Sequence, residues 1–461
     1  MFVDRSGPVN PSGVTASSRE TPGNVGFVPF WRFPRSGAVR ESTLLFGVLV
    51  AAVLVLRGPS ISQGFTIDES RWISTSRYFW ITFIDRDIFG PAWQPNYLVY
   101  THPPVARYAI GLGLWLQGWT PDRLNGRYDS LQSRAFNERA GNVPDPDLLL
   151  AARRVTRIFG VIAVILIYVV GRQLGGIVAG LAAVALTLVN PLLTTVWTRA
   201  LAESVVAAFS LGALALSLAV MPYVGLPRTR PWLPLTVGAA LALAAATKLN
   251  GGLGALGLGL FGLIQQGVAV SITRRTRGLR AWIDVGLVAV VLFVAVNPLL
   301  YVRPAERAVA LLQHRKDEME FQRAVFSAQA VPDGVWPHVS RVAWRTFETY
   351  ATPSGPLPFS PDVLLVAAGV GVLAWHTVSE LRRRQPGPLT LFGCWLVTTY
   401  ALVTQNLGFD SSHYYAPLVS SNVIVGGVAV AALLDCVWPL IGRRLAGRMG
   451  ADAQNVQTPA T

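Results

Sequence analysis

Long apolar segments, separated by short loops that carry arginines, are the feature that most restricts how this chain can fold. A helix needs roughly 20 mostly apolar residues to cross a bilayer. Segments that reach or approach this length are Ser42–Leu56, Val155–Val170, Ile177–Leu193, Ser204–Met221, Leu233–Thr247, Gly251–Val268, Trp282–Leu300, Val363–His376, Leu389–Thr404 and Ala416–Ile441. We therefore expect an all-α integral membrane protein with about ten transmembrane helices.

The composition excludes the classes that a strongly basic chain first suggests. The 461 residues carry a net charge of +14, but only 14% are charged and 52% are hydrophobic. The arginines cluster between apolar segments, a pattern typical of loops that orient a membrane protein rather than of nucleic-acid binding. Cys394 and Cys436 lie within apolar segments and lack the spacing of a zinc site or a redox pair.

A further apolar segment, residues 103–119, decides the topology. It opens with two prolines and is interrupted by Arg107 and Gln117, so we expect a short helix at the membrane surface that does not cross. With the N-terminus inside, every short arginine-rich loop then faces the cytoplasm, as the positive-inside rule requires. These loops hold Arg172, Arg228, Arg230, Arg274–Arg280, Arg382–Arg384, Arg443, Arg444 and Arg448.

The same argument divides the chain into domains and faces. We expect a disordered cytoplasmic tail over residues 1–41, a transmembrane catalytic domain over 42–441 and a second cytoplasmic tail over 442–461. Outer loops cover residues 57–154, 301–362 and 405–415, and short outer turns lie at Trp197–Glu203 and Lys248–Asn250. Most acidic residues fall in these outer segments, so we expect the chemistry to occur there.

Two carboxylates and a histidine mark the first outer loop. Asp68 and Glu69 are adjacent and precede Arg71, which suits a general base and a cation that keeps it ionised. The pair equally fits the N-terminal cap of an amphipathic helix over residues 70–84. His102 precedes two prolines that present it at the membrane surface, either as a phosphate ligand or as an ordinary loop residue.

Charged residues also stand at the ends of later spans. Arg199 and Glu203 precede the fourth predicted span, and Lys248, one of only two lysines, interrupts an apolar stretch. Arg303 lies beside Tyr301 at the edge of another span. Each of these groups fits either an anion-binding site or a simple helix end.

A histidine and two tyrosines precede the last span. Tyr414 and Tyr415 fit the aromatic belt found where membrane proteins meet the lipid headgroups. His413 beside them is less easily explained as an anchor. We therefore include all three among the substrate-binding candidates.

Together these residues supply carboxylates, imidazoles and cations on one face of the membrane. Such a set suits a lipid-linked phosphate donor, whose anionic leaving group needs cations, and an acceptor hydroxyl that a carboxylate deprotonates. A membrane transporter or lipid flippase is the alternative. Transporters usually place charges within their spans and contain inverted repeats, whereas here the charges lie at span ends and no repeat is visible.

The order of these motifs resembles the GT-C class of membrane glycosyltransferases, in the branch shared by protein O-mannosyltransferases and lipid A aminoarabinose transferases. The insert over residues 122–150 matches neither group closely. The matching motifs, in chain order, are Asp68-Glu69-x-Arg71, His102-Pro103-Pro104, Arg154, Tyr168–Arg172, Asn190-Pro191, Arg199, Glu203, Thr247-Lys248-x-x-Gly251 and His413-Tyr414-Tyr415-x-Pro417.

The resemblance implies a GT-C fold and a phospholipid carrier-dependent glycosyltransferase, with roles for individual residues. Asp68 resembles the base that activates the acceptor, Glu69 a neighbour in the acceptor site, and Glu203 the second-loop carboxylate, so these three are the expected catalytic residues. Donor-phosphate and site-organising roles are implied for Arg71, His102, Lys248 and His413. We add Arg199, Arg303, Tyr414 and Tyr415 as substrate-binding candidates.

The implied reaction is an inverting transfer of a hexosyl or pentosyl group from polyprenyl phosphate to a protein, lipid or polysaccharide hydroxyl. It is expected on the outer face of the plasma membrane, with both termini in the cytoplasm and no nucleic-acid partner. Distant oligosaccharyltransferase relatives hold a divalent ion with carboxylates that correspond to Asp68 and Glu203. Two carboxylates are few ligands for magnesium or manganese, so we expect no obligatory metal.

Overall fold

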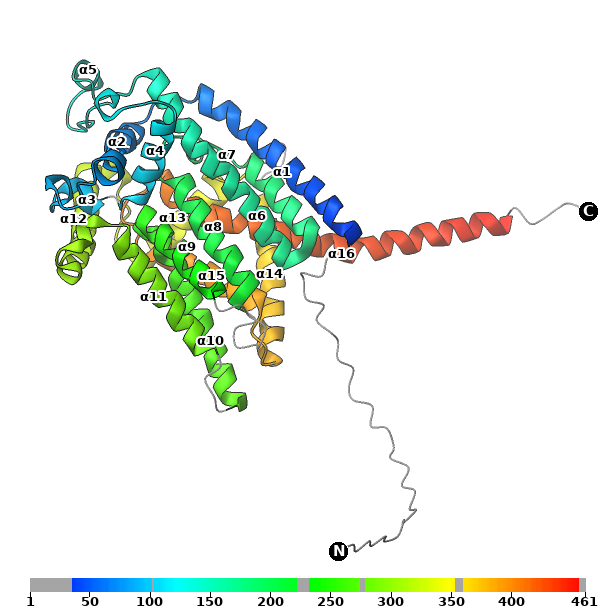
Figure 1. Ribbon diagram of the computed structural model, residues 1–461. Coiled ribbons are helices and arrows are strands. Elements are labelled where there is room, and N and C mark those ends of the chain that lie inside the picture. Colours follow the sequence, from blue (N-terminus) through cyan, green and yellow to red (C-terminus); the bar gives the residue numbers. More distant parts are fainter. Residues whose placement is uncertain (1–34, 102, 222–231, 274–277, 353–359, 456–461) are drawn as a thin grey trace, which may run out of the picture. The chain divides into compact units, whose positions relative to one another are not determined.

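Helices make up most of the computed structural model, which describes residues 35–101, 103–221, 232–273, 278–352 and 360–455 (Figure 1). Apart from one isolated bridge between Ala330 and Phe409, the residues in these ranges form no strand. The chain divides into two units, Met1–Thr43 and Leu44–Thr461, and apart from residues 35–43 the features described below belong to the second. The expected all-α class is confirmed.

The long helices coincide with the predicted apolar segments. They are α1 (Arg35–Ser62), α6 (Pro146–Val189), α8 (Glu203–Val220), α9 (Leu233–Thr247), α10 (Leu253–Thr273), α11 (Leu279–Ala295), α14 (Pro361–Arg382), α15 (Pro388–Gln405) and α16 (Ala416–Asn455). Within the described ranges, 6 helical segments are long and apolar enough to cross a membrane, namely Glu41–Gly58, Pro146–Val189, Glu203–Val220, Leu249–Ile272, Pro361–Arg382 and Ala416–Val437. The chain is therefore a multi-pass membrane protein, and the total of about ten spans stays a prediction.

Helix α6 consists of two helices joined by a sharp turn. Gly175 and Gly176 have non-helical backbone angles, and Gly176 has a φ of 78°, which favours glycine. A Cβ atom added at Gly180 would lie 2.8 Å from the carbonyl oxygen of Tyr168, whereas the same stretch of straight helix would span about 18 Å. The two halves therefore fold back on each other, and they account for two of the predicted segments.

Glycines allow the long helices to approach closely. Helix α6 packs against α8 and α16, and α9 packs against α8 and α11. A Cβ atom at Gly427 of α16 would lie 2.4 Å from the carbonyl oxygen of Ala179 in α6, and one at Gly238 of α9 would lie 2.5 Å from that of Val285 in α11. Small residues at such contacts are typical of helices that associate in lipid.

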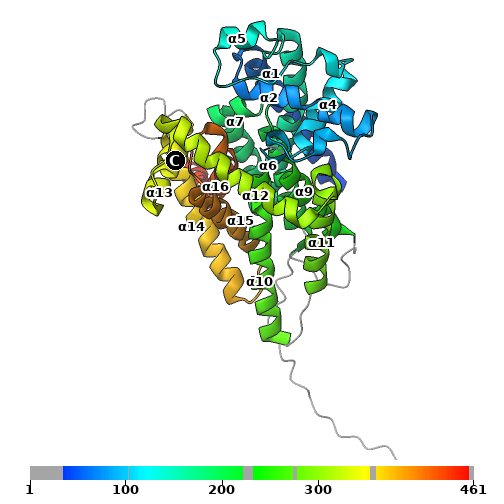
Figure 2. The same ribbon diagram turned by 90° about the vertical axis from the view of Figure 1, so that its left-hand side faces the viewer.

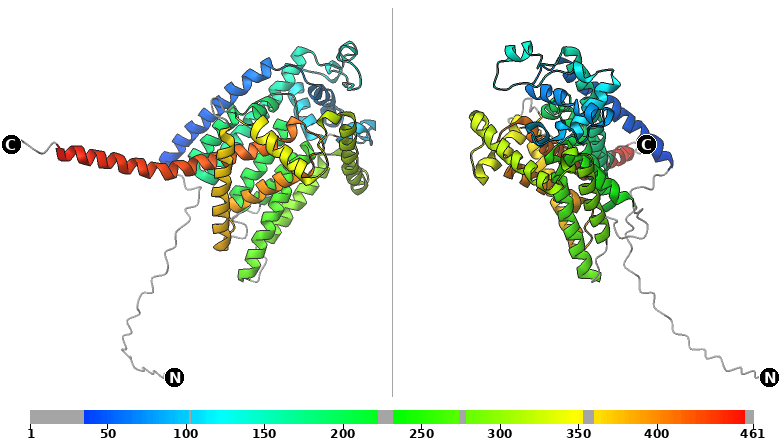
Figure 3. Two further views of the ribbon diagram at one scale, coloured as in Figure 1. Left: turned by 180° about the vertical axis from the view of Figure 1, so that it is seen from behind. Right: turned by 60° about the vertical axis from the view of Figure 1, so that its left-hand side comes forward.

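The first outer loop folds into short helices with a core of their own. Trp72, Trp80, Trp93, Ile110 and Leu114 are buried in this core. Figures 1 and 2 show the short helices gathered at one end of the long helices, and Figure 3 shows the same arrangement from two further sides. The helices are α2 (Ile67–Thr75), α3 (Tyr97–Thr101), α4 (Val105–Leu116) and α5 (Arg134–Arg139). A further short helix, α7 (Pro191–Val196), lies between α6 and α8 and packs into the core of the long helices.

The loop predicted over residues 301–362 is also largely helical. It forms α12 (Pro304–Val325) and α13 (Val335–Trp344). Helix α12 packs against α3 of the first outer loop, so these two loops meet at the same end of the long helices (Figure 1).

Segment 103–119 forms the short helix α4, as its sequence predicts. The 12 residues of this helix span about 18 Å, well below the roughly 30 Å thickness of a bilayer core. Arg107 lies fully buried within it, with its guanidinium 4.8 Å from the centre of the Tyr78 ring. Helix α4 is therefore too short to cross.

The amphipathic helix expected over residues 70–84 is interrupted. Helix α2 ends at Thr75, and a separate π-helical turn covers Trp80–Ile84. The hydroxyls of Ser74 and Thr75 donate to the carbonyl oxygen of Arg71, and that of Ser76 donates to the carbonyl oxygen of Ile73. Side chains that bond locally in this way compete with continued helix, which explains the break.

The topology predicts which loops a reagent outside the cell can reach. In a Cys436→Ser background, which removes the exposed native cysteine, Gln132→Cys should react with a membrane-impermeant maleimide in intact cells. Arg383→Cys should react only after permeabilisation, because its arginine-rich loop is predicted to face the cytoplasm. The reverse labelling pattern would show that the orientation is inverted.

Candidate active site

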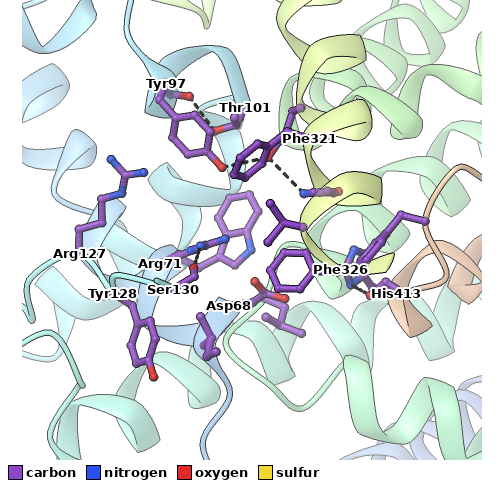
Figure 4. A pocket seen from close by; sticks show the side chains of 18 of the residues that line it. Asp68, Arg71, Tyr97, Thr101, Arg127, Tyr128, Ser130, Phe321, Phe326 and His413 are labelled. Atoms are coloured by element: carbon purple, nitrogen blue, oxygen red, sulfur yellow. Dashed lines mark hydrogen bonds between the residues drawn. The ribbon is translucent and has the colours of Figure 1, made fainter. Parts of the chain in front are cut away.

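A single cavity of about 1060 Å³ collects most of the residues that the sequence singles out. Its walls come from α2, α3, residues 127–142 of the insert over residues 122–150, the turn before α8, the turn after α9, helix α12 and the segment before α16. All these segments belong to the loops that the arginine pattern assigns to one face. Figure 4 shows that Asp68 and His413 both point into this space.

Asp68 presents a free carboxylate to the cavity. It lies exposed in the first turn of α2, where negative charge interacts favourably with the helix dipole. No described residue forms a hydrogen bond or an ion pair with its side chain. An unpaired carboxylate in a cavity can accept a proton from a bound hydroxyl, which is the role expected of a general base.

Glu69, by contrast, is completely buried and does not line the cavity. Arg153 Nε donates to Glu69 Oε1 at 2.7 Å, and Arg153 Nη2 donates to Oε2 at 2.8 Å. The backbone N–H groups of Ala200 and Thr66 and the Thr66 hydroxyl also donate to this carboxylate. The expected catalytic role of Glu69 is therefore corrected to a positioning role, because its oxygens are occupied and removed from the cavity.

Helix geometry explains why the adjacent carboxylates have different surroundings. Successive residues of a helix differ by about 100° in direction, so Asp68 faces the cavity when Glu69 faces the interior. Glu69 also forms a capping box with Thr66 at the start of α2. The capping interpretation of the sequence is thus confirmed for Glu69.

Arg153 was not among the residues that sequence reasoning selected. It belongs to an Arg-Arg pair at the start of α6, of which the resemblance marks Arg154. Arg154 is exposed, whereas Arg153 is buried and also donates to the backbone carbonyl oxygens of Gln63 and Gly64. The charged pair within an apolar helix was the available signal, but nothing in the pattern distinguished its two members.

Glu203 and Lys248 form an ion pair in the cavity wall. Lys248 Nζ lies 2.7 Å from Glu203 Oε1, and it lies 5.4 Å from the centre of the Tyr414 ring. Lys248 ends α9 and precedes the short turn Leu249–Gly252, which directs its side chain toward the start of α8. The structure therefore brings together three of the predicted site residues from distant parts of the chain.

His413 stands beside this pair as a neutral ring. It stacks edge-on against Tyr414 with 4.5 Å between ring centres, and its Nδ1 lies 3.0 Å from the Ser411 hydroxyl. Burial and the charge of Lys248 lower the pKa of His413 to about 4, although Glu203 and Asp68 oppose this effect. At neutral pH His413 therefore offers hydrogen bonds rather than the positive charge that a phosphate ligand was expected to supply.

Arg315 of α12 supplies a cation that the sequence did not reveal. Its Nη1 lies 2.5 Å from Glu318 Oε2, and its Nη2 donates to the Tyr414 hydroxyl at 2.8 Å. The Tyr97 hydroxyl donates to the other oxygen of Glu318 at 3.1 Å. Helix α12 carries many charges, so no periodic signal separated Arg315 from its neighbours.

Arg71 and Arg127 lie on the opposite side of Asp68 from His413, as Figure 4 shows. Arg71 Nη2 donates to the Ser130 hydroxyl. The Arg127 guanidinium lies 4.8 Å from the centre of the Tyr97 ring. Burial and Glu318 raise the pKa of Tyr97, and the two arginines oppose this rise.

Tyr415 is buried beneath the cavity rather than exposed to it. Its hydroxyl donates to Asp410 Oδ1 at 2.8 Å. Arg341 and Arg345 also bind the Asp410 carboxylate, at 2.9 and 2.7 Å. Burial alone would raise the pKa of Asp410, but these hydrogen bonds and charges lower it below its usual range. Tyr415 therefore supports the segment that carries His413 and Tyr414.

The remaining predicted residues lie outside the cavity or outside the described ranges. Arg199 donates to the Gln63 side chain at 3.1 Å and does not line the cavity. Arg303 starts α12 with a φ of 55°, is 73% exposed and pairs with Glu306. Arg303 does not line the cavity, and its substrate-binding role stays a prediction. His102 falls outside the described residues.

The residues present fit a divalent metal poorly. Asp68 and Glu203 line the same cavity, but Glu203 is already neutralised by the Lys248 ammonium at 2.7 Å. A hard cation such as Mg²⁺ prefers several oxygen ligands. Among the residues that the structure describes, no group of 3 or more His, Cys, Asp or Glu side chains could supply them.

Known proteins resemble this chain in sequence over one region and in fold over most of it. Residues 93–302 match the family described as dolichyl-phosphate-mannose-protein mannosyltransferase (PMT). No curated protein matches the sequence. ArnT from Cupriavidus metallidurans, solved bound to undecaprenyl phosphate, has 18% identity and a TM-score of 0.52 over 93% of this chain and 67% of its own.

A second solved structure extends the likeness. The archaeal oligosaccharyltransferase AglB from Archaeoglobus fulgidus, in complex with an inhibitory peptide and a dolichol-phosphate, has 13% identity and a TM-score of 0.52. The match covers 88% of this chain but only 52% of AglB. The chain therefore shares the fold of these GT-C glycosyltransferases, as the resemblance implies, and residues 93–302 match the PMT family model.

The buried Glu69–Arg153 pair predicts a large loss of stability when one partner is removed. Glu69→Gln should lower the free energy of unfolding by about 3–5 kcal/mol, because it removes the carboxylate charge that binds the buried Arg153 guanidinium. The measurement is the thermal unfolding midpoint of purified protein in detergent. Glu138→Gln, which breaks the exposed pair with Arg134, is the control and should change stability by less than about 1 kcal/mol. Equal midpoints for both variants would contradict the structural role of Glu69.

Proposed function

We propose that this chain, a GT-C fold protein with a PMT-family domain, transfers a sugar from a polyprenyl-phosphate carrier to an acceptor hydroxyl. The observation that carries the proposal is the unpaired Asp68 carboxylate in the same cavity as Lys248 and Arg315. A base and cations are the two kinds of group that such a transfer requires. The lipid phosphates bound to ArnT and AglB support a carrier of this class.

The proposed reaction is a single displacement that inverts the anomeric carbon. Asp68 accepts the proton of the acceptor hydroxyl while its oxygen forms a bond to that carbon. The bond from the same carbon to the phosphate oxygen breaks, and polyprenyl phosphate leaves as an anion. The leaving phosphate needs no proton, so cations rather than an acid stabilise the developing charge.

The donor phosphate is proposed to bind beside Lys248, Arg315 and Tyr414. Lys248 and Arg315 supply positive charge, and the Tyr414 hydroxyl already accepts a hydrogen bond from Arg315 at 2.8 Å. Neutral His413 can donate a further hydrogen bond. Glu203 holds the Lys248 ammonium in place at 2.7 Å, which is a positioning role. His102 keeps its expected place near the phosphate as part of the proposal.

The proposed setting is the outer face of the plasma membrane. The arginine-rich loops favour cytoplasmic termini, and the cavity is built from segments on the opposite side of the chain. The sugar is a hexose or a pentose, and the acceptor hydroxyl belongs to a protein, a lipid or a polysaccharide.

Removing the proposed base tests the function directly. Asp68→Asn should reduce sugar transfer by about 10²–10⁴-fold, the usual contribution of a general base, with an unchanged unfolding midpoint. The measurement is the release of free polyprenyl phosphate by purified protein from a panel of polyprenyl-phosphate sugars. Asp122→Asn, an exposed carboxylate of the same loop outside the cavity, is the control. Wild-type transfer by Asp68→Asn would refute the assignment of the base.

We also propose that turnover needs no obligatory metal. A divalent ion would be bound by Asp68 and Glu203 together, and Glu203 already forms an ion pair with Lys248. Transfer in excess chelator should stay within about twofold of the untreated rate, since protein cations act on the leaving phosphate. The measurement is polyprenyl phosphate release after dialysis against chelator. Loss of turnover that manganese or magnesium restores would overturn this part of the proposal.

A further inference from the structure

Two arginines in the cavity wall have no carboxylate partner among the described residues. The Nε atom of Arg71 is buried without a hydrogen-bond partner, although its Nη2 donates to the Ser130 hydroxyl. The Arg127 guanidinium contacts the face of the Tyr97 ring, and no described residue accepts a hydrogen bond from it. Both guanidinium groups can therefore bind an anion without first breaking an ion pair.

The other cations of the cavity differ from this pair in position and in pairing. Lys248 is bound to Glu203 and Arg315 is bound to Glu318. Arg71 and Arg127 both act electrostatically on Tyr97, whereas Lys248 and Arg315 both act on His413. Figure 4 shows Asp68 between His413 on one side and Arg71 with Ser130 on the other. The cavity thus contains two groups of cations, Lys248 with Arg315 on the His413 side of Asp68 and Arg71 with Arg127 on the other side. Glu318 connects them, because it accepts a hydrogen bond from Tyr97 and binds Arg315.

Arg71 and Arg127 make up the second group together with Ser130, the hydrogen-bond partner of Arg71, and two of the three, Arg127 and Ser130, belong to the insert over residues 122–150. Arg127 and Ser130 precede α5, and Ser130 lies within hydrogen-bonding distance of Arg71. Asn137 holds this part of the insert in place, because its amide accepts from the backbone N–H of Asp129 and donates to the carbonyl oxygen of Asp129. The insert therefore builds one wall of the cavity rather than a loose loop.

We propose that Arg71, Arg127 and Ser130 form an acceptor site that recognises a phosphate or carboxylate group on the acceptor. The inference rests on the proposed function, in which the donor phosphate occupies the Lys248–Arg315 side. An acceptor anchored at Arg71 and Arg127 presents its hydroxyl between the two groups of cations, where Asp68 lies. Guanidinium groups suit this role because their planar donors match the oxygens of carboxylates and phosphates.

Binding of small aromatic anions tests the site without any catalytic step. Purified protein is first saturated with undecaprenyl phosphate to fill the donor side, and is then titrated with phenyl phosphate, benzoate or neutral benzyl alcohol by isothermal titration calorimetry. Phenyl phosphate or benzoate should bind at one site per protein molecule, and benzyl alcohol should show no binding. The preferred anion distinguishes a phosphate from a carboxylate on the acceptor.

Substitutions locate this binding. Arg127→Gln removes an exposed arginine and leaves the core untouched. It should lower the affinity for the anion by roughly tenfold or more, the loss expected for a charge-assisted hydrogen bond. Arg71→Gln should do the same. Arg139→Gln removes an exposed arginine of the same insert that does not line the cavity, and it should leave binding unchanged. Equal anion affinity of Arg127→Gln and wild type would overturn the proposed acceptor site. The absence of anion binding to protein saturated with undecaprenyl phosphate would overturn it as well.

Transfer to paired acceptors gives a second readout. Octyl glucoside 6-phosphate should be used at least about tenfold better than octyl glucoside, as measured by kcat/KM, and Arg127→Gln should remove most of this preference. Equal use of both acceptors by the wild type would contradict the inference while leaving the glycosyltransferase proposal intact. Failure of undecaprenyl phosphate to bind, with no transfer to either acceptor, would instead refute the proposed function.

Discussion

The buried ion pair between Glu69 and Arg153 is the interaction on which the rest of the site depends. It connects residues 84 positions apart, and the same carboxylate also binds the N–H groups of Thr66 and Ala200. A buried charge is tolerated only when its hydrogen bonds are satisfied, and here five donors satisfy it. Because this network fixes the rotation of α2, the preceding residue in the chain, Asp68, faces the cavity.

A second buried carboxylate fixes the opposite wall. Asp410 binds Arg341 and Arg345 from the end of α13 and the Tyr415 hydroxyl from the start of α16. Its backbone N–H also donates to the carbonyl oxygen of Gln329 at 2.8 Å. The loop over residues 301–362 is thereby held against the segment that carries His413 and Tyr414. Each side of the cavity is thus anchored by one carboxylate that cannot itself reach the substrate.

The sequence predicts the helices well because the bilayer imposes a length and a composition on each span. It also predicts that residues 103–119 form a short helix and that Asp68, Glu203, Lys248, His413 and Tyr414 share a face. It could not show that Glu69 is buried away from the acceptor site, since that depends on Arg153 approaching from α6. Arg315 was missed for the same reason, because a charged residue of an outer helix gains its meaning only from Glu318 and Tyr414.

The pairing of the donor-side cations has a consequence for turnover. In the proposed reaction the donor is a phosphodiester with one negative charge, whereas the released polyprenyl phosphate is a monoester that can carry two. Unpaired cations would therefore bind the product more tightly than the donor and slow its release. Glu203 and Glu318 offset part of the charge of Lys248 and Arg315 at 2.7 and 2.5 Å. The site can then stabilise the charge that develops in the transition state while still releasing the product.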